Sequence, residues 1–279
     1  MHNSRKIIKL ASFYVFASLF AFFALLPFFW MLFSAFKENG ALIIVPIQWL
    51  PKPVSLFAFE QIFNIVGGDL FTRSMLNSTF VSISITVITI LSASMAAFVF
   101  AKFKFRNKER LFAIFLATMM IPSQVTTIPI YLVMSNIGLV DKFTGLIITS
   151  IFNAFAVFLL RQSMAGIHND YMDAAIIDGS SYFGVYRNVM LPLCKPILIS
   201  LGVITFMGAW NDYFWPLVLI TSTNKFTLPL ALARLREQYQ SRHNILMAGA
   251  LISMLPILVI YFFAQKYFET GLQVGGLKA

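Results

Sequence analysis

The stretch YMDAAIIDGSSYFGVYRNVMLP, residues 171–192, interrupts an otherwise apolar chain with polar residues and two glycines. Just before it, Asn169 or Asp170 can cap a helix N-terminus, and Asp173 places a carboxylate in the first turn, where the helix dipole favours negative charge. Gly179 is suited to the left-handed conformation that ends many helices. The stretch therefore predicts a short helix terminated by a glycine turn.

A second short helix is predicted beyond that turn. Ser180 or Ser181 can cap it, its body covers residues 182–190, and Pro192 closes it by disfavouring helical backbone at Leu191. Apolar and aromatic residues give the segment more apolar surface than a water-exposed connector needs, which is typical of a contact surface. The residues alone leave open whether that surface meets another protein, lipid or the chain's own helices.

The composition is that of a membrane protein. Of 279 residues, 59% are hydrophobic and 11% are charged, and the mean hydropathy is +0.80. An ordinary soluble domain carries about a quarter charged residues. The net charge of +10 does not indicate nucleic-acid binding, because positive loops are a feature of membrane topology and no basic stretch is interleaved with aromatics outside the apolar runs.

Six apolar runs are long enough to cross a bilayer core of about 30 Å as helices. The first follows basic residues like a signal peptide but is far longer than a signal sequence, so we interpret it as a retained span. The chain is thus expected to be an all-α membrane protein with one transmembrane domain over residues 1–279. The expected spans cover approximately residues 10–36, 74–101, 111–135, 143–160, 196–220 and 245–265, with a polar loop at 166–195.

The distribution of basic residues predicts the orientation. With the N-terminus inside, 13 of the 21 Lys and Arg residues fall on the inner side and 8 fall outside. The dense basic stretch AKFKFRNKER, residues 101–110, decides the arrangement. Both termini and the polar loop are then cytoplasmic, while the loop 37–73 lies outside and carries a short helix over residues 57–64.

The spacing within the polar loop resembles the EAA loop of inner-membrane permease subunits from binding-protein-dependent ABC importers. Asp173 stands where that family prefers Glu, and Val189 where it prefers Ile. Further stretches, among them MMIPSQVTTIPIY at 119–131 and WNDYFWPL at 210–217, resemble the carbohydrate-uptake branch and the second, six-span permease of the maltose system. The residues that carry the loop's resemblance are Asp173, Ala174, Ala175, Gly179, Val189, Leu191 and Pro192.

The resemblance implies an ABC type I importer permease fold, in which the EAA loop is a cytoplasmic coupling helix. It implies a multi-pass transport subunit of a bacterial inner membrane that forms the pore with a second homologous permease and contacts lipid. Two ATPase subunits, which bind ATP and Mg, dock on the EAA-loop residues, and an extracytoplasmic sugar-binding protein delivers the substrate. The expected cargo is an oligosaccharide or related solute, and a glycerol phosphate-like polyol is the alternative within the family.

The sequence contains no pattern of residues that is typical of a catalytic or metal-binding site. No GxxxxGK[ST] motif is present, so the chain has no P-loop for a nucleotide of its own. His2, His168 and His243 are scattered, and no acidic cluster lies in a span, which argues against a metal site or a proton pump. We expect neither a catalytic residue nor a cofactor in this chain.

Asp212 is the only acid well inside an apolar run. Helical spacing places Thr205, Gly208 or Ala209, and Pro216 on its face, which suits a pore lining, although structural hydrogen bonding explains the carboxylate equally well. The tryptophans beside Asp212 can stack on a sugar ring or anchor the span at the interface.

Prolines interrupt the third span, and polar residues between them can satisfy the backbone groups that the prolines free or can face water, so the region is either a gate or a packing kink. The candidate pathway or gate residues are Pro122, Gln124, Thr127, Trp210, Asn211 and Asp212.

Two other classes of protein remain as alternatives. A secondary transporter or channel would work without an ATPase. A membrane enzyme would require a reactive group, for which Asp212 is the best candidate.

Overall fold

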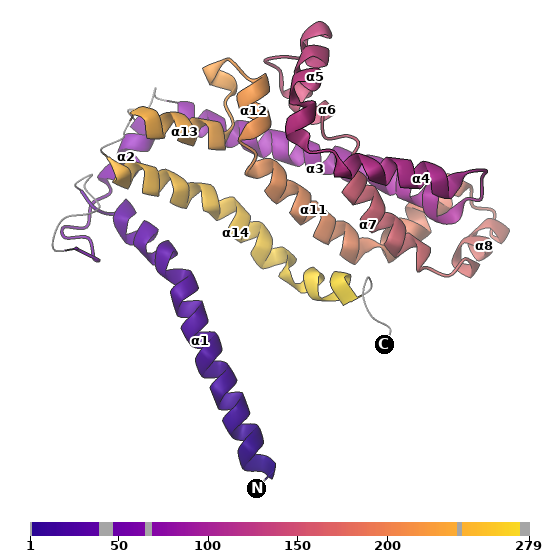
Figure 1. Cartoon of the computed structure of the whole chain (residues 1–279), viewed down its shortest axis with the longest axis horizontal. Helices are drawn as coiled ribbons and strands as arrows, with labels where there is room; N and C mark the ends of the chain where they lie inside the picture. The colour runs from indigo at the N-terminus through magenta and orange to yellow at the C-terminus, as the bar shows by residue number, and fades with distance from the viewer. Residues whose placement is uncertain (1, 39–46, 65–68, 239–241, 274–279) are drawn as a thin grey trace. The chain divides into compact units, whose positions relative to one another are not determined.

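A computed structural model describes residues 2–38, 47–64, 69–238 and 242–273 (Figure 1). Within these residues the regular elements are helices, and the one β feature is an isolated antiparallel bridge between Lys37 and Val54. The all-α prediction is confirmed. The chain divides into two compact units, of which the first comprises Met1–Phe71 with Leu232–Leu255 and the second Thr72–Ala231 with Pro256–Ala279.

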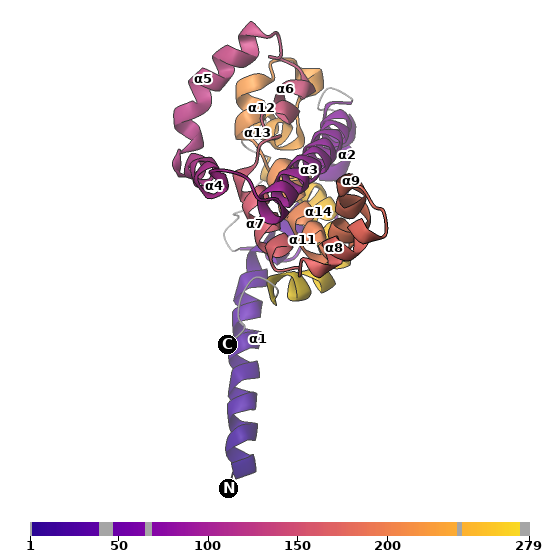
Figure 2. The ribbon, with the colours of Figure 1, turned by 90° about the vertical axis from the view of Figure 1, so that its right-hand side faces the viewer.

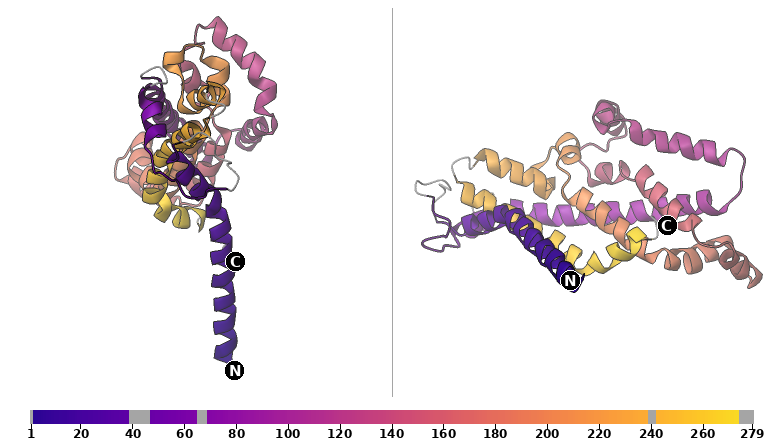
Figure 3. Two further views of the ribbon diagram at one scale, coloured as in Figure 1. Left: turned by 90° about the vertical axis from the view of Figure 1, so that its left-hand side faces the viewer. Right: turned by 60° about the horizontal axis from the view of Figure 1, so that its bottom comes forward.

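The first unit contains α1 (His2–Ala35), α2 (Phe57–Asn64) and the adjoining parts of α13 (Leu228–Gln238) and α14 (His243–Gln273). Figure 3 shows α1 as one unbroken helix in both views, although Pro27 lies inside it. The position of α2 matches the helix expected over residues 57–64. Asn244 holds the chain after α1 by donating its side-chain amide to the Lys37 carbonyl at 2.9 Å.

The second unit is built around α3 (Leu70–Lys102), an apolar helix long enough to span a membrane. Its serine and threonine side chains bond neighbouring segments; for example, the Ser92 hydroxyl donates to the Ile151 carbonyl at 2.7 Å. The other helices of this unit that precede α13 are α4 (Lys108–Ala117), η1 (Thr118–Met120), α5 (Ser123–Asn136), α6 (Phe143–Ile148), α7 (Ala154–Ala165), α8 (Asp170–Ile177), α9 (Tyr182–Val185), the π-helical turn η2 (Tyr186–Met190), α10 (Leu191–Leu193), α11 (Lys195–Trp210), α12 (Phe214–Leu219) and η3 (Thr223–Lys225).

Three of the six expected spans are continuous helices, at Lys9–Ala35, Leu70–Lys102 and His243–Lys266. The third expected span, residues 111–135, is broken instead, because α4–η1 and α5 meet at an angle of 99° (Figure 2). Pro122 lacks an N–H and forces Ile121 into extended backbone, with φ −84° and ψ 116°. Pro129 lies inside α5 without breaking it.

The fourth and fifth expected spans, residues 143–160 and 196–220, each consist of two helices. The first of them divides into α6 and α7, and the second into α11 and α12. At each break an Asn or Asp side chain caps the following helix, since Asn153 Oδ1 accepts from Ala156 N at 3.0 Å and Asp212 Oδ1 accepts from Phe214 N at 3.0 Å. Such side chains compete with helical hydrogen bonds and start new helices.

Asp141, in the loop between α5 and α6, joins two loops that lie far apart in sequence. Its Oδ1 accepts from the backbone N–H groups of Thr221 and Ser222 at 3.0 and 2.9 Å. Its Oδ2 accepts from Ser222 Oγ and from Lys225 Nζ at 2.5 and 2.8 Å. The Lys225 ammonium, followed by the Ser222 hydroxyl, holds the pKa of the Asp141 carboxyl well below its usual range.

We expect Asp141→Asn to lower the unfolding free energy by about 1–2 kcal/mol at neutral pH, because it weakens charge-assisted hydrogen bonds. A lowered folded-state pKa means that this stabilisation is present above the usual aspartate pKa of about 4 and is lost as the pH falls through the lower folded value. Thermal unfolding in detergent across pH checks this. A gap between wild type and variant that closes between pH 6 and 8 contradicts it, and Lys225→Met serves as the matched variant.

Candidate functional site

The polar loop begins with α8, whose C-terminus is closed as the sequence predicts. Gly179 has φ +87°, which places it in the left-handed region. Gly179 N donates to the Ile176 carbonyl and Ser180 N donates to the Ala175 carbonyl, both at 2.9 Å. This pair of bonds is the Schellman motif, which satisfies carbonyls that the helix end leaves open. The glycine turn is confirmed.

The N-terminus of α8 differs from the prediction. Asn169 precedes the helix, but neither its side chain nor that of Asp170 caps α8. Lys102, at the end of α3, occupies the Asn169 side chain by donating to its Oδ1 at 3.0 Å, and also donates to the Ile167 carbonyl at 2.5 Å. The entry to α8 is therefore fixed to the end of α3.

The second helix of the loop is capped as expected but does not end as expected. Ser181 Oγ accepts from Gly184 N at 3.1 Å. The helix then widens into the π-helical turn η2 and continues through Leu191 and Pro192, so the prediction that Pro192 closes it is wrong. A wider turn gives the proline ring room beside the preceding carbonyls, which an α-helical turn would not.

The two faces of α8 have different environments. Met172 and Ala175 pack against the buried core of the unit. Asp173, Ala174 and Ile177 lie on the opposite face, and all three are exposed, Ile177 to 84%. Their spacing of one and three residues places them side by side on the helix. The loop thus presents a carboxylate, a small residue and a bare apolar side chain on one exposed face.

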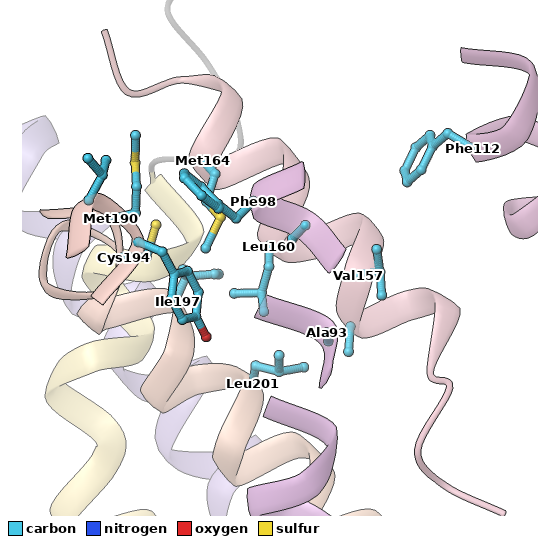
Figure 4. Close-up of a cluster of buried hydrophobic side chains, with 14 residues drawn as sticks. Ala93, Phe98, Phe112, Val157, Leu160, Met164, Met190, Cys194, Ile197 and Leu201 are labelled. Carbon is cyan, nitrogen blue, oxygen red and sulfur yellow. The ribbon is translucent and has the colours of Figure 1, made fainter. Parts of the chain in front are cut away.

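A buried cluster beneath the loop joins it to the long helices. Figure 4 shows Met164, Met190, Cys194 and Ile197 gathered with Phe98 of α3. The predicted EAA-loop residues Val189 and Leu191 pack against this cluster, whereas Pro192 is exposed. The structure therefore separates these residues into a set facing out of the loop and a set supporting it. The outward set is Asp173, Ala174, Gly179 and Pro192, and the supporting set is Ala175, Val189 and Leu191.

Gly179→Ala tests the turn without adding a steric clash. A Cβ at this position meets no other atom within 4 Å, so its cost comes from the left-handed backbone alone. We expect a loss of about 1–2 kcal/mol in unfolding free energy. Thermal unfolding in detergent measures it. Gly208→Ala, at a helical glycine whose Cβ also meets no other atom within 4 Å, is the control and should not destabilise the protein; an equal loss in both variants contradicts the assignment.

A cavity of about 550 Å³ lies in the second unit, among α3, η1, α7, α11 and the segments next to them. Asp212 lines it together with Thr205, Gly208 and Ala209, which confirms that these residues share a face. Pro216, which was expected on the same face, is buried in α12 and lies outside the lining.

The other candidate pathway residues do not line this cavity. Trp210 is only 2% exposed and stacks on Phe206 with ring centroids 5.7 Å apart, so in this unit it is neither a sugar platform nor an interface anchor. Asn211 donates to the Met207 carbonyl at 2.9 Å and closes α11. Pro122 lies at the break before α5, and Gln124 and Thr127 lie in the first turns of α5. Pro122 and Gln124 are exposed, and Thr127 is half-buried.

An ion pair with no predicted role joins α7 to α4. Arg161 Nη2 of α7 donates to both carboxylate oxygens of Glu109 in α4, at 2.7 and 2.8 Å, and Arg161 Nε donates to the Phe100 carbonyl at 3.3 Å. Its guanidinium lies 3.9 Å from the ring centroid of Phe112. The sequence feature that could have indicated this pair is the single Arg at the end of the apolar run 143–160, which was used only to predict the membrane orientation.

Comparison with known proteins identifies the family. The profile of the family "Binding-protein-dependent transport system inner membrane component" matches residues 88–274. The chain belongs to this family. The matched region contains the polar loop at residues 166–195, and the resemblance to this family stated from the sequence is confirmed.

Two relatives and one solved structure illustrate the permease's likeness. It is 33% identical over 258 residues to the arabinooligosaccharides transport system permease protein AraQ of Halalkalibacterium halodurans, with 92% of each chain covered. It is 26% identical over 261 residues to the lactose transport system permease protein LacG of Rhizobium radiobacter, with 94% of this chain and 93% of the relative covered. The crystal structure of a bacterial ABC transporter involved in the import of the acidic polysaccharide alginate has a chain with the same fold, at a TM-score of 0.82 and 24% identity, with 95% of this permease and 98% of that chain covered.

Membership of this family establishes the general class of the protein. It is a multi-pass inner-membrane permease component of a binding-protein-dependent transport system. Such a component is a transport subunit and not itself an enzyme. The membrane-enzyme alternative is therefore set aside.

Proposed function

We propose that this permease forms half of the translocation pore of an ATP-driven importer for a carbohydrate. The observation that carries the proposal is the outward face of α8, where Asp173, Ala174 and Ile177 are exposed together on a helix that packs against the core. An exposed apolar patch of this kind is typical of a protein contact. Relatives that carry arabinooligosaccharides and lactose, matched over nearly their whole length, support the carbohydrate class of cargo.

The proposed partners supply the functions that a permease subunit does not perform itself. This chain has no P-loop of its own. In the proposed complex, ATP and Mg bind to two cytoplasmic ATPase subunits, which dock on the polar loop at residues 166–195, called the coupling segment from here on. A second, homologous permease completes the pore, and an extracytoplasmic binding protein delivers the sugar to the outer loops. The basic stretch at residues 101–110 supports a topology in which both termini and the coupling segment are cytoplasmic.

The mechanism requires α8 to move as a lever. Lys102 fixes the start of α8 to the end of α3. Met172 and Ala175 pack on the cluster that contains Met190 and Ile197, which continues into α11. When the ATPases close on ATP, displacement of α8 would carry the ends of α3 and α11 with it. ATP thus biases the pore between inward-facing and outward-facing states.

Purification of the tagged permease with its native complex tests the proposal. We expect an ATPase subunit to co-purify, and hydrolysis of ATP to rise when the binding protein is added with its sugar. Absence of any ATPase subunit from a complex that still transports the sugar would instead favour a secondary transporter or channel.

A further inference from the structure

We propose that the cavity around Asp212 is a binding site for an uncharged sugar within this subunit. The inference rests on the proposed function and adds that the permease itself contacts its cargo and selects against anions. The volume of about 550 Å³ falls within the usual range of pockets for small molecules. The lining residues that bear on the proposal are Phe152, Asn153, Phe155, Thr205, Gly208 and Asp212.

The lining offers hydrogen-bonding atoms that the fold does not use. Asp212 caps α12 through Oδ1, which accepts from Phe214 N and Trp215 N, and its Oδ2 has no partner in the described part of the chain. Asn153 likewise caps α7 through Oδ1 and keeps its Nδ2 donor. The structure describes no hydrogen bond from the Thr205 hydroxyl. A carboxylate oxygen, an amide donor and a hydroxyl together match the alternating donors and acceptors of a sugar's hydroxyl groups.

The same lining supplies apolar surface for the C–H face of a sugar ring. Phe152 is 84% exposed and Phe155 is 40% exposed, and both line the cavity. Aromatic rings are flat, rigid and apolar, so they can pack against that face while polar groups hold its edge. Trp210, which the sequence suggested for this role, is buried elsewhere.

The charges of the lining residues favour neutral sugars over sugars that carry a negative charge. Asp212 is the only ionisable residue among the described lining residues, which include no Lys, Arg or His. A phosphate or uronate group entering the cavity would give up hydration without gaining a counter-charge. The site therefore suits neutral oligosaccharides and disfavours a glycerol phosphate-like polyol.

Two variants test the site in the reconstituted complex. Gly208→Phe fills the cavity from a position where a Cβ meets no other atom within 4 Å. Asp212→Asn keeps the cap, because an Asn oxygen also accepts from helix N–H groups, but removes the charge. Met207→Phe, outside the lining, is the control. The probes are lactose and arabinotriose as neutral sugars, and glycerol phosphate and digalacturonate as anions.

We expect the complex to carry a neutral probe and neither anion. Gly208→Phe should reduce uptake at least tenfold while the second permease co-purifies and sugar-loaded binding protein still stimulates ATP hydrolysis. Asp212→Asn should raise the KM for uptake on the order of tenfold, as expected for a lost charge-assisted hydrogen bond, with an unchanged Tm. A purely structural Asp212 predicts an unchanged KM in this variant.

The outcomes separate this inference from the proposed function. Wild-type uptake of an anion, or normal KM and normal uptake in both variants, overturns the sugar site while ATP-driven import stands. Transport that does not depend on an ATPase overturns the proposed function and the sugar site with it.

Discussion

Ala174→Trp abolishes transport while the permease stays folded in the membrane. Ala174 is exposed on α8, on the same side as Asp173 and Ile177, so an indole added there occupies the space that a docked ATPase would need. Loss of a central contact in an interface costs about 2 kcal/mol or more, so we expect uptake and ATPase co-purification to fall roughly 30-fold or more. Uptake of radiolabelled sugar and the ATPase content of the purified complex measure the effect.

The control for this variant is Ala165→Trp, which adds the same ring at another exposed alanine, the last residue of α7. We expect near-normal uptake there. Ala175→Trp would not serve, because Ala175 packs against the buried cluster and its enlargement would disturb the fold. Equal activity of the Ala174 and Ala165 variants would remove α8 as the docking helix.

Met190→Ala destabilises the protein by about 2–5 kcal/mol. Met190 is fully buried beneath the coupling segment, in the cluster that includes Val185, Cys194 and Leu160. Its truncation leaves a cavity between η2 and the long helices. Thermal unfolding in detergent gives the loss of stability, and the ratio of sugar moved to ATP hydrolysed should fall, because a loosened α8 transmits less of its displacement.

Leu193→Ala is the matched control, since Leu193 follows closely on the chain but is 48% exposed. We expect its unfolding free energy to change by less than about 1 kcal/mol. A loss as large as that of Met190→Ala would show that the cluster does not carry the stability assigned to it.

Local patterns in the sequence were sufficient for the turn at the centre of the coupling segment. Gly179 adopts the predicted left-handed backbone and Ser181 caps the next helix, because both features depend on residues within a few positions. The cap assigned to Asn169 was wrong because Lys102, 67 positions away along the chain, occupies that side chain. The helix and capping propensities of neighbouring residues cannot predict a contact between residues so far apart in the sequence.

The apolar runs predicted where the apolar helices lie, but they did not predict where these helices are interrupted. Pro122 was recognised as an interruption, but the size of the bend, 99°, was not predicted. Asn153 and Asp212 sit inside apolar runs, and their capping roles appear only where the following backbone turns toward them. The bond between Asp141 and Lys225 joins residues 84 positions apart and had no signal in the sequence.

The most direct test of the account is sugar accumulation in proteoliposomes that contain the full complex, with the binding protein outside and ATP and Mg trapped inside. Vesicles loaded with ATP should accumulate the neutral sugar against its gradient, and matched vesicles loaded with ADP, or with Ala174→Trp permease, should not. Equal accumulation with ATP and with ADP would contradict the proposal that α8 couples this permease to an ATPase.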